Sequence, residues 1–289
     1  MQSPAPLPPL EADLPHAALR ILSRSKRFTT PSGEGDVVWH TWGEGEPLVL
    51  LHGGSGSWTH WIRNVEALAE AGRRVVVPDL PGFGDSARPS GGQDADFVAP
   101  VVAEGIRDLL GEAPVDVAGF SFGGLCGALM AAAHPERVRR LVIVGAPGLG
   151  LRSRRLPLTS WREQPTREGQ LAAHRSNLAT LMLSREDAID DLAVALQAAN
   201  VPHDRMHRRK LALTDILLQK LPEIRCRLDA IYGEEDALYR DTLPLLKERL
   251  ATAPTLRELV FIPGAGHWVQ YEDAPAFQRE LLRLLASPP

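Results

Sequence analysis

Short apolar runs recur along this chain from about Lys26 onward, and longer amphipathic stretches separate them. The runs span Val37–Trp42, Leu48–Leu51, Arg74–Pro78, Val115–Ala118, Leu141–Val144, Arg227–Tyr232 and Leu256–Ile262. Strands that alternate with helices form crossover units on a parallel sheet. Near-continuous valine and leucine, as in LVLL and RRVVVP, indicates strands covered on both faces. The pattern therefore predicts an α/β fold with a mostly parallel sheet and helices on both faces.

The alternation stops between Val144 and Leu228. A stretch rich in proline and arginine comes first, and helical periodicity without a strand candidate follows it. Ser184 and Asp187 have the spacing of a capping box, which would open a helix within this insertion. The predicted division is a proline-rich leader over 1–23, a core over 24–149 and 223–289, and a helical cap over 150–222.

Charge and cysteine content exclude several kinds of partner. The formal net charge is −4 and the pI is near 6.2, so the chain has no overall attraction for nucleic acid. Cys126 and Cys226 lack CxxC spacing and a histidine cluster, so neither a disulfide framework nor a zinc site is indicated. The N-terminus lacks the basic and apolar regions of a signal peptide, and we expect a cytoplasmic protein.

No cofactor or membrane is expected either. The uncharged stretch from Val117 to Ala133 contains four glycines, so it indicates a buried strand, turn and helix rather than a membrane span. No HExxH, P-loop or dinucleotide-binding motif occurs, and we expect no metal or organic cofactor. The expected partner is a small-molecule substrate, and self-association is left open.

The segment VDVAGFSFGG (115–124) places Ser121 between an apolar strand and a helix of small residues. A nucleophile on such a sharp turn needs glycine two positions before and after it, here Gly119 and Gly123, so that backbone and helix can approach. The start of the following helix then directs free N–H groups, that of Phe122 first, at a developing oxyanion. We predict that Ser121 is a nucleophile.

A second loop follows the strand at 48–51 and carries His52, Gly53 and Gly54. Glycine allows a backbone N–H to come within about 3 Å of a reacting oxygen. We predict that the N–H groups of Gly54 and Phe122 form the oxyanion hole. His52 has no acid close in sequence, and we interpret it as a residue that organises the loop.

The remaining candidates follow the last two apolar runs. IYGEEDAL (231–238) ends a strand with three acids, of which Asp236 is our choice to orient an imidazole, while Glu234 and Glu235 suit a solvated loop. The glycine-rich loop of FIPGAGHW (261–268) presents His267 after the acid. Ser121, Asp236 and His267 thus occur in the chain order expected for a nucleophile, acid and base on such a sheet.

From about residue 26 to its end the chain resembles the α/β-hydrolase superfamily. The resemblance implies an eight-stranded, mostly parallel sheet with an inserted helical cap, and a serine hydrolase with Ser121, Asp236 and His267 as its triad. VVVPDLPGFGDSARP (75–89) resembles a turn of the family in which Asp79 and Ser86 are structural. GHWVQYEDAPAF (266–277) is similar to the meta-cleavage-product carbon–carbon hydrolases, which implies that Trp268 lines the pocket. We place Gly53 with Trp268 among the substrate-binding residues.

The substrate is less constrained by the sequence. Resemblance to the carbon–carbon hydrolases implies a cap arginine near a substrate carboxylate, but the comparable segment 195–205 offers Asn200. The charged neighbours of the cap arginines suggest a solvated face. These arginines are Arg175, Arg205, Arg208 and Arg209, with Arg205 the first candidate for a carboxylate ligand. We therefore expect an esterase of small apolar or aromatic substrates, with a carbon–carbon hydrolase or a non-catalytic ligand receptor as alternatives.

Overall fold

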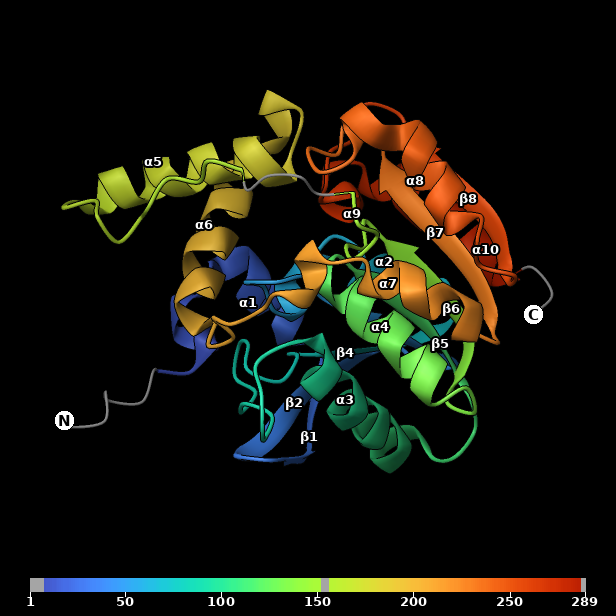
Figure 1. Cartoon of the computed structure of the whole chain (residues 1–289). Helices are drawn as coiled ribbons and strands as arrows, with labels where there is room; N and C mark the ends of the chain where they lie inside the picture. Colours follow the sequence, from blue (N-terminus) through green and yellow to red (C-terminus); the bar gives the residue numbers. More distant parts are fainter. Residues whose placement is uncertain (1–7, 152–155, 287–289) are drawn as a thin grey trace.

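The computed structural model describes residues 8–151 and 156–286, and an eight-stranded sheet lies at its centre (Figure 1). The strand order is β1-β2-β4-β3-β5-β6-β7-β8; β2 pairs antiparallel with β1 and β4, and all other pairs are parallel. The strands are β1 (Lys26–Ser32), β2 (Gly35–Trp42), β3 (Glu46–Leu51), β4 (Arg73–Pro78), β5 (Val115–Phe120), β6 (Val138–Val144), β7 (Arg227–Gly233) and β8 (Leu256–Ile262). The predicted α/β-hydrolase architecture is confirmed.

Both faces of the sheet are covered, because successive side chains of a strand point to opposite sides. On β5, Val117 joins the core cluster that contains α3, α4 and α8, while Ala118 joins the cluster that contains α2 and α10. The helices are α1 (His16–Leu22), α2 (Val65–Glu70), α3 (Ala95–Leu110), α4 (Phe122–Ala133), α5 (Arg167–Asn177), α6 (Asp191–Asn200), α7 (Ile216–Lys220), α8 (Leu243–Leu250), α9 (Val269–Glu272) and α10 (Ala274–Ala286). Continuous apolar runs in the central strands follow from this double burial.

The apolar runs did not reveal β1. Its sequence KRFTTPS has mostly exposed side chains, so it lacks an apolar pattern; it is held instead by antiparallel pairing along β2. Edge strands need only one hydrogen-bonding neighbour and often carry polar and charged side chains.

Between β6 and β7 the described residues form helices and loops and contain no strand. This segment includes α5, which extends away from the sheet, and α6, which leads back towards it (Figure 1). A five-residue π-helical turn, Leu178–Met182, follows α5 directly. The extent of a separate cap domain stays a prediction, but the elements over this range are helical as expected.

The predicted capping box is wrong. Asp190 caps α6 by accepting a hydrogen bond from the Ala193 N–H at 2.8 Å, and Glu186–Ala188 forms a separate 3₁₀ turn. Ser184 lies outside both elements, and its hydroxyl donates to the Gly264 carbonyl at 2.7 Å. The side chain of Ser184, which the local spacing predicts at the start of a helix, therefore makes a long-range contact instead.

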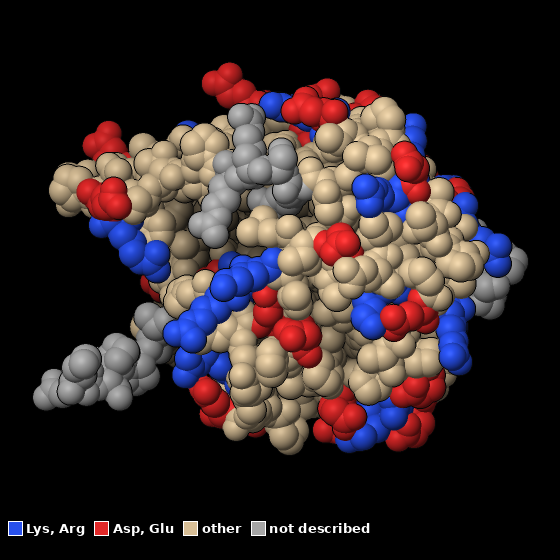
Figure 2. Space-filling model, in the orientation of Figure 1, with Lys and Arg blue, Asp and Glu red and all other residues tan. Residues whose placement is uncertain are grey.

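Acidic and basic residues are interspersed over the face shown in Figure 2, which is hollowed between α5 and the body of the molecule. Within residues 8–151 and 156–286, no helix has the length and apolar character that crossing a bilayer requires.

Candidate active site

Ser121 occupies a strained turn between β5 and α4. Its φ of 49° lies in the left-handed region, which costs a residue other than glycine about 1–3 kcal/mol. A Cβ on Gly119 would lie 2.5 Å from the Gly123 carbonyl oxygen, and one on Gly123 would collide with the carbonyls of Leu51 and His52. Both glycines of the motif are therefore required by close backbone approach, as the sequence suggested.

Ser121, His267 and Asp236 form one hydrogen-bonded series at the carboxyl ends of β5, β8 and β7. His267 Nε2 lies 2.9 Å from Ser121 Oγ, and His267 Nδ1 lies 2.7 Å from Asp236 Oδ2. Asp236 is fully buried and His267 is 3% exposed, whereas Glu234 and Glu235 are exposed. The structure thus brings the three predicted residues together. The arrangement allows the imidazole to take a proton from the hydroxyl while the carboxylate holds its other nitrogen.

Two backbone N–H groups near Ser121 are available to an oxyanion. Neither Gly54 N–H nor Phe122 N–H has an acceptor within the described parts of the chain, 8–151 and 156–286. By contrast, Gly53 N–H donates to His60 Nδ1 at 3.1 Å, and Gly53 O lies 2.8 Å from His52 Nδ1. Gly53 has no free N–H for a substrate, and its visible role is to shape the loop.

Two histidines hold this loop in place. His52 Nε2 accepts the Leu80 N–H at 2.8 Å, and burial lowers the pKa of His52 to about 4, so the ring is neutral. This supports the interpretation of His52 as a loop-organising residue. The sequence gives no indication of this role for His60, because the residue stands among tryptophans and a threonine in a helix-like stretch. Its ring is buried 5.0 Å from that of Trp268, and burial holds the pKa of His60 well below its usual value.

The turn after β4 supports the same loop from the other side. Asp79 Oδ1 accepts the Trp58 N–H at 2.9 Å, and Asp79 Oδ2 accepts the Asp85 N–H at 3.0 Å. Ser86 Oγ donates to the Asp79 carbonyl and accepts the Val38 N–H. Burial raises the pKa of Asp79 to about 7. These contacts are structural, as the resemblance implied.

Trp268 lies directly after His267 and is 1% exposed. Its indole N–H donates to the His60 carbonyl at 2.9 Å, and its ring stacks on Tyr271 with centroids 4.2 Å apart. Only the apolar part of the ring is left for a ligand, so its contact with substrate stays a prediction.

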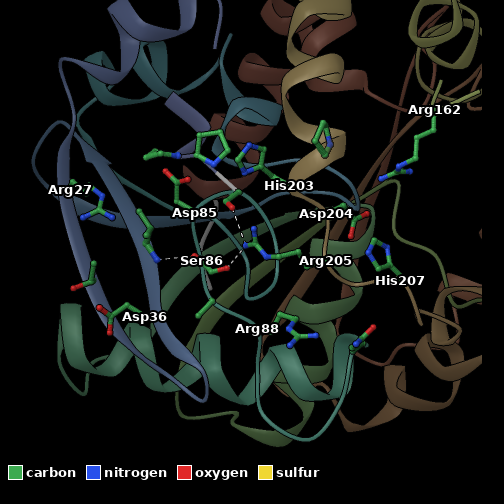
Figure 3. A pocket seen from close by; sticks show the side chains of 18 residues that line it. Arg27, Asp36, Asp85, Ser86, Arg88, Arg162, His203, Asp204, Arg205 and His207 are labelled. Atoms are coloured by element: carbon green, nitrogen blue, oxygen red, sulfur yellow. Dashed lines mark hydrogen bonds between the residues drawn. The ribbon is translucent and has the colours of Figure 1, made fainter. Parts of the chain in front are cut away.

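The arginines of the helical segment differ in their surroundings, which corrects the expectation of one solvated face. Arg205 Nη2 donates to the carbonyl oxygens of Ser86 and Gly84, at 2.5 and 3.0 Å, and it points towards that turn in Figure 3. Its guanidinium therefore fastens the segment to the turn after β4. Arg208 is exposed, as predicted.

Arg209 lies beside the predicted oxyanion loop. A Cβ on Gly54 would be 3.5 Å from its guanidinium carbon, which also lies 5.5 Å from the centre of the Phe122 ring. Arg209 makes two hydrogen bonds to Asp204, at 2.8 and 3.0 Å, and its side chain is 22% exposed. Burial of Asp204 opposes its ionisation, but Arg209 and the Ser55 hydroxyl hold the pKa of Asp204 below its usual value. A cation thus lies beside the two residues predicted to supply the oxyanion hole.

Asn200 cannot take the place of that cation. It is buried, its side-chain oxygen accepts from Ser57 Oγ at 2.7 Å, and its amide nitrogen donates to Thr59 Oγ1 at 2.8 Å. Both polar atoms are used to hold α6 against the segment that follows the oxyanion loop.

Comparison with known proteins adds to this geometry. A family model described as alpha/beta hydrolase fold matches residues 46–274. A 2-hydroxy-6-oxononadienedioate/2-hydroxy-6-oxononatrienedioate hydrolase of Comamonas testosteroni is 30% identical over 85% of this chain and 89% of its own. A 2-hydroxy-6-oxo-6-phenylhexa-2,4-dienoate hydrolase of Burkholderia cepacia is 29% identical over the same shares. The solved carboxylesterase CesB from Bacillus subtilis matches with a TM-score of 0.76 at 20% identity, over 94% of this chain and 97% of its own. The last likeness concerns the fold alone.

Proposed function

Because the chain belongs to the alpha/beta hydrolase fold family, we propose that it is a serine hydrolase that cleaves a carbon–carbon bond next to a ketone in an unsaturated oxo acid. The relatives that are about 30% identical support this over the ester preference expected from the sequence, since both are named for 2-hydroxy-6-oxo acids. The observation that carries the proposal is the position of Arg209 beside Gly54 and Phe122.

The first half of the reaction forms an acyl-enzyme. His267 takes the hydroxyl proton as Ser121 Oγ attacks the ketone carbon, and Asp236 stabilises the resulting imidazolium. Negative charge then develops on the former ketone oxygen, where the free N–H groups of Gly54 and Phe122 would stabilise it.

Breaking the carbon–carbon bond requires a stabilised carbon leaving group. In the 2-oxo tautomer of such an acid, the 2-hydroxyl proton has moved to the carbon next to the ketone. The electron pair of the broken bond can then spread through the double bond to the 2-oxo oxygen. Protonation gives a 2-hydroxydienoate. Water, deprotonated by His267, next attacks the acyl-enzyme and releases a carboxylic acid, so that one water is consumed per bond cleaved.

Arg209 suits the acid end of this substrate. The carboxylate is charged throughout the reaction, and the 2-oxygen on the neighbouring carbon gains charge during cleavage. Burying a carboxylate without a partner costs several kcal/mol. A guanidinium has five N–H donors, and the two hydrogen bonds to Asp204 with the 3.4 Å contact to Ser55 Oγ leave others for a second carboxylate.

The test compares a substrate panel on the wild type. A meta-cleavage product such as 2-hydroxy-6-oxo-6-phenylhexa-2,4-dienoate should have a kcat/KM more than tenfold above that of any p-nitrophenyl or aromatic ester. Esters that are turned over better would restore the esterase interpretation. Failure of a fluorophosphonate to label Ser121 would favour the ligand receptor.

A set of variants tests the role of Arg209. Arg209→Gln would leave Asp204 without its cation, so the double variant Asp204→Asn/Arg209→Gln is the informative one. Loss of one charged hydrogen bond of about 1.5–3 kcal/mol predicts a 10- to 150-fold lower kcat/KM for the oxo acid. An uncharged ester should change less than threefold, and the exposed Arg208→Gln should change neither. Equal losses on acid and ester would contradict the carboxylate contact.

A further inference from the structure

A buried carboxylate joins the loop of His267 to the helical segment between β6 and β7. Glu272, the last residue of α9, is 3% exposed, yet it lies outside the series of Ser121, His267 and Asp236. The Ser184 N–H lies within 3.2 Å of both Glu272 carboxylate oxygens, but each oxygen has a different shortest contact. Oε2 accepts the Gly266 N–H at 2.6 Å, directly before His267. Oε1 accepts the backbone N–H groups of Ser184 and Arg185, at 2.9 and 2.6 Å.

Further contacts surround this carboxylate. Ser184 Oγ lies 2.7 Å from the Gly264 carbonyl oxygen and 3.0 Å from Glu272 Oε1, so its single hydroxyl proton is shared between the two acceptors. Arg185 Nη2 donates to the Glu272 carbonyl at 2.9 Å, and the Trp268 N–H donates to the Met182 carbonyl at 2.7 Å. These contacts join Met182–Arg185 to Gly264–Trp268 and Glu272.

We infer that Glu272 is a positioning residue for His267, and that it aligns the imidazole only while Ser184 and Arg185 are docked on it. The mechanism needs His267 Nε2 within hydrogen-bonding reach of Ser121 Oγ. His267 belongs to a loop that contains two glycines, Gly264 and Gly266. Such a loop has many accessible backbone conformations. The Glu272 carboxylate restricts the backbone conformation of this loop one residue before His267.

An amide cannot replace this carboxylate. All the groups that face the two oxygens are donors, and glutamine has only one acceptor oxygen. If the amide oxygen stays with the donors of Ser184 and Arg185, the amide nitrogen faces the Gly266 N–H. Glu272→Gln should therefore release the loop of His267 and retain the contacts to the helical segment.

The experiment measures how fast a fluorophosphonate phosphonylates Ser121 with loss of fluoride, because this step needs His267 and no recognition of an oxo acid. For Glu272→Gln we expect the maximal inactivation rate to fall at least tenfold, with the concentration for half-maximal rate changed less than threefold. The low-field proton resonance of His267 Nδ1–H, shared with Asp236, should weaken or broaden. Glu280→Gln is the matched control, since Glu280 pairs with Arg283 on its own helix, and it should stay within twofold of the wild type.

A purely structural role predicts a different result. A Glu272→Gln variant that is folded by near-ultraviolet circular dichroism and is phosphonylated at the wild-type rate would overturn the inference. If this variant does not fold, Ser184→Ala removes two side-chain hydrogen bonds and keeps the carboxylate. Phosphonylation slower by two- to fivefold would support the inference, and an unchanged rate would contradict it.

The inference rests on the proposed roles of Ser121 and His267 but not on the choice of bond cleaved. A poor rate on oxo acids with normal phosphonylation of Ser121 would defeat only the proposed function. No phosphonylation of the wild type would defeat both.

Discussion

Asp236→Asn tests the hydrogen-bonded series most directly, because the structure determines which way the new amide must face. Asp236 Oδ2 accepts from His267 Nδ1, and Asp236 Oδ1 accepts the Leu238 N–H at 2.9 Å. If the amide oxygen stays with Leu238, the amide nitrogen faces His267 Nδ1. That nitrogen must then be an acceptor, so Nε2 bears the proton and cannot accept the Ser121 hydroxyl. The variant should therefore favour the inactive tautomer.

The magnitude follows from the alternative orientation. Turning the amide oxygen to His267 leaves the Leu238 N–H facing another donor in a buried site, which costs about 1–3 kcal/mol. That penalty alone predicts roughly a 5- to 150-fold loss. Loss of the negative charge beside the imidazolium lowers the stabilisation of the transition state by a further amount of about 1.5–3 kcal/mol. Together these effects predict a decrease in kcat/KM of roughly 10²- to 10⁴-fold.

The assay is hydrolysis of a p-nitrophenyl ester together with fluorophosphonate labelling, normalised to folded protein. Glu234→Gln and Glu235→Gln are matched controls, since both side chains are exposed and should change kcat/KM less than threefold. Less than a tenfold loss in Asp236→Asn, or an equal loss in Glu235→Gln, would refute the reasoning.

Two further predictions concern the nucleophile and a buried histidine. Ser121→Ala and His267→Ala should each lower ester turnover about a thousandfold or more without changing the fold, because the three residues act as one unit; more than a few per cent of wild-type turnover in a purified variant would contradict this. Burial, with help from Arg27, lowers the pKa of His40 to about 4, so its unfolded form binds a proton below about pH 6.5 while the folded form stays neutral. Wild-type stability should thus fall between pH 6.5 and 4 by about 3 kcal/mol more than that of His40→Phe, as measured by urea unfolding; parallel pH profiles would show that His40 does not contribute.

The sequence predicted the strands β2 to β8, the turn of Ser121 and the order of the candidate residues, because each depends on neighbours close in the chain. Apolar runs indicate that a strand is buried on both faces. Gly119 and Gly123 indicate that neighbouring backbone segments lie in close contact around Ser121. Parallel strands then bring their carboxyl ends to one edge. Asp236 and His267 could therefore be selected without coordinates.

Contacts across the helical segment could not be predicted in this way. His174 and His203 are buried although charged residues follow them directly in the sequence, and Arg209 belongs to a charged run that suggests a solvated face. Nothing near Arg209 in the sequence indicates Gly54, and nothing near Glu272 indicates Ser184. Each pair meets only when the helical segment packs on the core.

Local conformation and burial pattern thus follow from the residues of each short segment, since glycine, β-branched and apolar side chains determine which conformations that segment can adopt. The position of Arg209 beside Gly54 depends on how the inserted helices dock, because its local sequence is equally compatible with a solvated side chain. The sequence therefore determined the fold and the three residues of the hydrogen-bonded series. Tertiary structure alone decided that Arg209 faces the oxyanion loop and that Glu272 holds His267, because both results depend on distances between segments that the chain sequence does not record.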